Sequence, residues 1–92
     1  MNETTTMTVR TFRHGTDKEC ARKVVEEAAE AFSAWESLDL FGGEDADLLD
    51  EFADELADTI TACANLAARY GLDLQAALDR VERHNRERGR YE

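Results

Sequence analysis

Apolar residues recur at helical spacing in three stretches of the chain. The first stretch follows Thr16 and Glu19, which lie three residues apart and have the form of a capping box, so we expect a helix that begins near Asp17. It should end before Gly42-Gly43, because paired glycines favour turns. Its apolar stripe consists of Ala21, Val24, Val25, Ala28, Phe32 and Trp35, and we expect the two aromatic residues to be core residues rather than base-stacking ones.

Two further stripes predict a second and a third helix. Asp45 or a neighbour is placed to cap the second helix, and Gly71 follows its end, where helices commonly close in a left-handed turn. Leu72 and Asp73 have the character of a staple and a cap for the third helix. The second stripe consists of Leu48, Leu49, Phe52, Leu56, Ile60, Cys63, Leu66, Ala67 and Tyr70, and the third of Leu74, Ala77, Leu78 and Val81.

These elements predict an all-α fold, a small helical bundle of three main helices formed by residues 16–92. Residues 1–15 are polar and rich in threonine, which predicts a loosely ordered N-terminal arm with Phe12 as its anchor. The chain has 92 residues and no proline, which agrees with a helical fold. Because so short a chain buries only a modest core, we expect homo-oligomerisation, as a homodimer or homotetramer, to complete the bundle.

The charge balance narrows the possible partners. The formal net charge is −10, from 21 acidic and 11 basic residues, which argues against nucleic acid and against anionic membrane surfaces as partners. The N-terminal stretch lacks the features of a signal peptide, and no apolar run approaches the roughly 20 residues that span a bilayer, so we expect a cytoplasmic protein. Cys20 and Cys63 form no zinc-binding motif and should act as small apolar residues.

Two pairs of acidic residues are candidates for a metal site. Residues three apart on a helix point the same way, so Glu27 shares a face with Glu30, and Glu55 shares one with Asp58. Both pairs are expected beside the apolar stripes, and packing of the two helices through those stripes would bring four carboxylates to one seam. Their mutual repulsion would be relieved by Mg²⁺, or by Mn²⁺, because hard cations prefer oxygen ligands.

A simpler interpretation of the same residues stays open. Acidic side chains are common on solvated helix faces, and Glu26 or Glu27 could pair with Lys23 on the protein surface. In the same way, the C-terminal arginines could merely complement the negative end of a helix.

The order and spacing of these motifs resemble those in the all-α nucleotide pyrophosphohydrolases, and in their MazG-like branch in particular. The resemblance rests first on Glu26-Glu27-Ala28-Ala29-Glu30, followed after a gap by Glu55-Leu56-Ala57-Asp58. The segment 66–78 is similar to the helix–turn–helix of that branch, and the segment 84–91 to its basic, asparagine-containing tail. Together these features cover residues 17–92.

The resemblance implies Mg²⁺-dependent hydrolysis of a nucleoside triphosphate to the monophosphate and pyrophosphate. It implies metal ligation by Glu27, Glu30, Glu55 and Asp58, catalytic roles for Glu26, Glu27 and Glu30, and substrate contacts by Lys23, Asn85 and Arg88. One departure is His84, which stands where such tails often carry lysine, and its largely neutral side chain weakens the expected phosphate contact.

Three other functions remain open. A phosphoribosyl-ATP pyrophosphohydrolase is the closest, since that family shares the Glu-Glu-Ala and Ala-Asp motifs, although the tail at 88–91 favours the MazG-like branch. A non-catalytic helical interaction module would use its acids only for solubility. A nucleic-acid-binding role for the C-terminal arginines is disfavoured by the overall charge.

Overall fold

The computed structural model describes residues 2–92 and contains three helices, which confirms the predicted all-α fold. They are α1 (Asp17–Leu40), α2 (Ala46–Arg69) and α3 (Leu74–Glu87). No strand is present in the described part of the chain. None of the helices within residues 2–92 combines the length and apolar character needed to cross a membrane.

Each helix begins at the predicted cap. The side chains of Thr16, Asp45 and Asp73 accept hydrogen bonds of 3.1, 3.0 and 3.0 Å from the backbone N–H three residues further on. These bonds satisfy amides that have no partner within the helix. At the end of α2, Gly71 adopts φ 61°, and the Leu72 N–H donates to the Ala67 carbonyl at 3.0 Å. This Schellman-type ending turns the chain toward α3.

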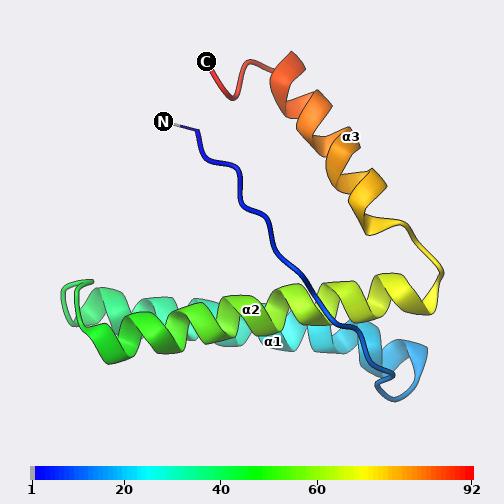
Figure 1. Cartoon of the computed structure of the whole chain (residues 1–92). Coiled ribbons are helices and arrows are strands. Elements are labelled where there is room, and N and C mark those ends of the chain that lie inside the picture. The colour runs from blue at the N-terminus through cyan, green and yellow to red at the C-terminus, as the bar shows by residue number, and fades with distance from the viewer. Residues whose placement is uncertain (1) are drawn as a thin grey trace.

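The helices do not form a closed bundle within one chain. The α1 and α2 helices pack side by side as an antiparallel hairpin, whereas α3 projects away from it (Figure 1). The radius of gyration is 15.4 Å, against about 12 Å for a compact domain of this length. The accessible surface is 7429 Å², against about 5,400 Å² for a compact monomer of this mass. The protomer therefore leaves much apolar surface uncovered.

The packing face of α1 differs from the predicted one. Small side chains and one acid, among them Cys20, Glu27 and Ala31, are buried against α2. The stripe that was expected to make this contact faces outward, with Phe32 60% and Trp35 44% exposed, so their placement in the core was wrong. Their rings pack on each other with centroids 5.8 Å apart. The small side chains are the reason, because they let the two backbones approach where bulky rings would hold them apart.

The N-terminal arm crosses the helix hairpin and continues toward the C-terminus (Figure 1). Its attachment is the Phe12 backbone N–H, which donates to Asn65 Oδ1 on α2 at 2.8 Å. Phe12 as a whole is 60% exposed, so its backbone hydrogen bond rather than burial of its ring anchors the arm. Farther along, the Asn2 side chain donates to the Tyr91 carbonyl at 2.7 Å, which joins the two ends of the chain.

Candidate active site

Three of the four predicted metal ligands converge in the seam between α1 and α2. One carboxylate oxygen from each of Glu27, Glu55 and Asp58 lies within 4.8 Å of the others. Glu55 and Asp58 share a face of α2 because they are three residues apart. Glu27 approaches from α1 and is only 6% exposed. The packing of α1 on α2 therefore brings three of the four predicted acids together, with Glu27 buried inside the seam.

The fourth predicted ligand, Glu30, borders this group of three, which we call the acidic cluster. Burial raises the pKa of the Glu55 carboxyl above its ordinary value, and the charge of Glu30 and a hydrogen bond with it raise this pKa further. The charges of Asp58 and Glu27 act in the same direction. These acids therefore repel one another when they are charged.

The acidic cluster has oxygen atoms that lack partners. Oε2 of Glu27 and Oε2 of Glu55 are buried, and neither accepts a hydrogen bond from any residue in the described range. A buried charged oxygen without a donor is costly. Carboxylate oxygens at this spacing match the preference of Mg²⁺ and Mn²⁺ for hard ligands. The residues present therefore fit a divalent cation.

Lys23 forms an ion pair with Glu27, which the sequence analysis gave as an alternative to a metal site. Its Nζ lies 2.9 Å from Oε1 of Glu27, and this hydrogen bond is the main cause that raises the pKa of Lys23. Only one oxygen of Glu27 is engaged, and the other, Oε2, is buried without a hydrogen-bond donor among the described residues. Glu26 is exposed and outside the cluster, although its charge also raises the pKa of Lys23.

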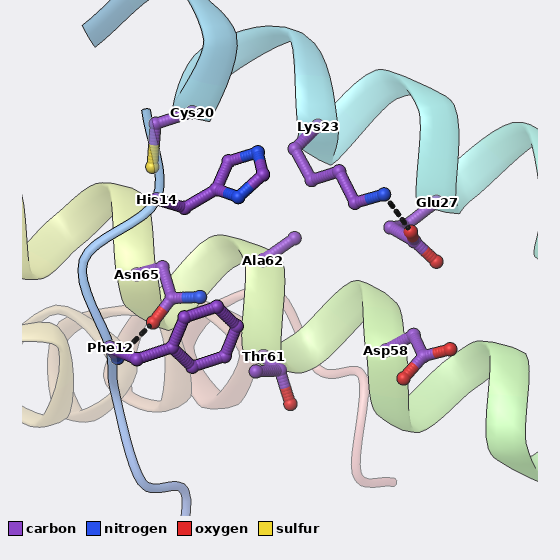
Figure 2. A pocket seen from close by; sticks show the side chains of 9 residues that line it. All are labelled: Phe12, His14, Cys20, Lys23, Glu27, Asp58, Thr61, Ala62 and Asn65. Atoms are coloured by element: carbon purple, nitrogen blue, oxygen red, sulfur yellow. Dashed lines mark hydrogen bonds and ion pairs between the residues drawn. The ribbon is translucent and has the colours of Figure 1, made fainter. Parts of the chain in front are cut away.

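A pocket of about 210 Å³ opens beside the acidic cluster (Figure 2). Glu27, Asp58 and Lys23 form one end, and Phe12 and His14 from the arm line the other, together with Asn65. The sequence analysis missed His14 and Asn65 as pocket residues. Asn65 did carry a signal, because it lies seven residues, about two helical turns, after Asp58 on the same face of α2.

The remaining two predicted substrate contacts lie elsewhere. Asn85 and Arg88 belong to the end of α3, which projects away from the hairpin (Figure 1). Neither lines the pocket beside the acidic cluster. One copy of the chain therefore unites the acids with Lys23 but not with the basic end of α3.

Comparison with known protein families identifies one family that matches this chain. Residues 1–85 match the family model of phosphoribosyl-ATP pyrophosphohydrolase, whereas comparison with curated proteins and with solved structures gave no significant match. The matched region includes the arm and ends before the tail at 88–91. The match favours the phosphoribosyl-ATP pyrophosphohydrolases, the alternative in the sequence analysis, over the MazG-like branch. These enzymes are hydrolases that act on acid anhydrides. The chain belongs to the phosphoribosyl-ATP pyrophosphohydrolase family, within the MazG-like all-α nucleoside triphosphate pyrophosphatase superfamily.

Proposed function

We propose that this protein hydrolyses phosphoribosyl-ATP to phosphoribosyl-AMP and pyrophosphate. The family match supports the substrate. The observation that carries the chemistry is the acidic cluster, with two buried carboxylate oxygens that lack hydrogen-bond donors. A solvated acidic face would leave such oxygens in water, so their burial favours a cation-binding role.

Mg²⁺, or Mn²⁺ in its place, is the cofactor that these residues fit. Glu27, Glu55 and Asp58 would hold it, and Glu30 beside Glu55 is our candidate for a fourth ligand. When bound, the cation neutralises charge on the phosphate oxygens and makes a bound water a better nucleophile.

Two side chains near the acidic cluster are assigned the remaining roles in the reaction. In the reaction, a water oxygen bonds to phosphorus while the anhydride bond between the α- and β-phosphates breaks, and the water gives up a proton. We assign Lys23, at the mouth of the pocket, to neutralise phosphate charge. Glu26 is exposed directly before Glu27, and we assign it to orient the water and to accept its proton.

A second copy of the chain is expected to complete the site. Each protomer exposes about 2,000 Å² more than a compact protein of its mass, which is the range that obligate dimers bury on each side. The exposed faces include Phe32 and Trp35 on α1 and Val81 on α3. Pairing through these faces could carry Asn85 and Arg88 of one copy toward the acidic cluster of the other.

Sedimentation velocity tests this assembly. The wild type should sediment as a dimer or tetramer, and Trp35→Glu should shift it toward monomer. Ser33→Glu adds the same charge about 160° farther round α1 and should leave the assembly intact. A monomeric wild type would contradict the proposed assembly.

The direct test of the function follows both products of hydrolysis. With Mg²⁺ and phosphoribosyl-ATP, we expect pyrophosphate and phosphoribosyl-AMP in equal amounts. Release of orthophosphate, or no release, would refute the proposal.

The wider activity on ordinary nucleoside triphosphates is the second candidate. The feature that favours it is the basic tail at 84–91, which resembles the MazG-like branch and lies mostly beyond the family match over residues 1–85. A panel of ordinary triphosphates in the same assay separates the two substrates.

A further inference from the structure

A second pocket, of about 480 Å³, lies next to the first and shares two residues with it. Phe12 and Asn65 line both pockets, so the two pockets are neighbours on either side of these residues. The second pocket also contains Arg13 from the arm, Arg69 from the end of α2 and Asp17 from the start of α1.

The charges of the second pocket favour an anion. Arg69 Nε lies 2.7 Å from Asp17 Oδ1, which neutralises one of the two arginines and leaves an excess positive charge. Nη1 of Arg69 is buried and donates to no acceptor within residues 2–92. Arg13 is exposed and forms no ion pair with any described residue. Guanidinium groups match phosphate oxygens in geometry and charge.

The first pocket has the features of a site for a heterocyclic base. Its volume lies below the roughly 300 Å³ at which whole-ligand sites begin, so it accommodates only part of a nucleotide. The rings of Phe12 and His14 lie on two sides of the opening (Figure 2). Between them Asn65 is 5% exposed, its Oδ1 accepts from the arm, and its Nδ2 points away from that bond into the pocket (Figure 2). An aromatic face and a free amide donor suit a planar base.

The acidic cluster and the two pockets follow one another along α2. Their positions on α2 are marked by Asp58, Asn65 and Arg69. At a rise of about 1.5 Å per residue, Asp58 and Arg69 are roughly 16 Å apart along the helix. Phosphoribosyl-ATP carries its chemical groups in the same order: the triphosphate, the adenine and the phosphate of the added ribose.

We propose that Arg13 and Arg69 bind the phosphate of the phosphoribosyl group, which ATP lacks, and thereby select phosphoribosyl-ATP over ATP. This inference rests on the proposed function and assigns its substrate specificity. Arg13 is the residue to test, because Arg69 also holds Asp17 and its loss could loosen the hairpin.

Binding of two products tests the inference without requiring hydrolysis. Calorimetry with Mg²⁺ should show that the wild type binds phosphoribosyl-AMP at least about tenfold more tightly than AMP. Arg13→Gln should remove most of that preference and change AMP binding by less than about twofold. Arg10→Gln is the matched control, because Arg10 is an exposed arginine of the same arm that lines neither pocket.

Two results would overturn the inference: equal affinity of the wild type for the two products, or an unchanged preference in Arg13→Gln. The assay of pyrophosphate release separates this failure from failure of the function. Release from phosphoribosyl-ATP without a binding preference refutes the role of Arg13 and Arg69 and leaves the activity standing. A preference that Arg13→Gln removes, without any release, upholds the phosphate site and refutes the activity.

Discussion

Lys23 and Glu27 form an ion pair at the edge of the α1–α2 seam, with 2.9 Å between Nζ and Oε1. The pair occupies one oxygen of a carboxylate whose other oxygen is buried and has no hydrogen-bond donor among the described residues. In the proposed mechanism, Lys23 would compete with the cation for Glu27 in the free protein and would become available to phosphate once the cation is bound. This relationship would link metal binding to substrate binding.

Replacing Lys23 should separate these two effects. In Lys23→Gln, a cation no longer competes with the ammonium group, so we expect Mn²⁺ affinity to stay equal or to rise several-fold. The value of kcat/KM should fall at least about tenfold, because a charged phosphate contact is lost. Calorimetry with Mn²⁺ and steady-state kinetics measure the two quantities.

Lys18→Gln is the control for this prediction, since it removes the same charge from an exposed position on α1. Weaker Mn²⁺ binding in Lys23→Gln than in Lys18→Gln would show that Lys23 supports the cation site instead of competing with it.

The raised pKa of Glu55 predicts how the metal-free protein responds to pH. Because the folded state disfavours the charged carboxylate, Glu55 contributes stability at pH values below its unfolded pKa and loses it as pH rises through the raised folded pKa. The side chain in Glu55→Gln is neutral at every pH, so this variant does not lose stability in this way. Denaturant unfolding in EDTA should therefore show the variant gaining free energy of unfolding relative to wild type as pH increases from about 4 toward 7.

Glu51→Gln controls for the general effect of removing an acid from α2, because Glu51 is exposed and outside the acidic cluster. If the difference between Glu55→Gln and wild type does not change with pH, the repulsion inferred around Glu55 is absent.

Asn65 should hold the arm in place. Asn65→Ala deletes the acceptor for the Phe12 N–H and leaves a small cavity, so we expect a loss of about 1–3 kcal/mol in the free energy of unfolding. Trypsin should then cleave after Arg10 and Arg13 several-fold faster, because local release of the arm exposes these bonds. Mass spectrometry of a short digest reports the cleavage.

Asn65→Asp keeps an acceptor for the Phe12 N–H and should protect the arm better than Asn65→Ala. Asn85→Ala provides a matched amide deletion outside the arm contact. Equal cleavage rates in Asn65→Ala and wild type would show that this hydrogen bond does not secure the arm.

The features that could be predicted from the sequence are those determined by neighbours in the chain. The caps at Thr16, Asp45 and Asp73 and the turn at Gly71 depend on hydrogen bonds that span a few residues. Pairing of Glu55 with Asp58 on one face follows from helical spacing in the same way. Local chemistry was therefore sufficient for the helices and for two of the three members of the acidic cluster.

The features that the sequence analysis missed depend on packing between distant segments. The apolar stripe of α1 indicated that a face is to be covered, but not that α2 would pack on the adjacent face of small residues, with Glu27 inside it. The pocket needs a contact between Phe12 and Asn65, which lie 53 residues apart. No periodicity along the chain encodes such a contact.

A titration with Mn²⁺, followed by electron paramagnetic resonance of the free ion, tests the central claim most directly. The wild type should bind Mn²⁺, and Glu27→Gln, Glu55→Gln and Asp58→Asn should each weaken binding at least about tenfold, because affinity depends on the charge and number of the oxygen ligands. Asp50→Asn, an exposed acid of α2 outside the acidic cluster, should bind like wild type. Binding that is equal in all four variants, or absent from the wild type, would contradict a metal site between α1 and α2.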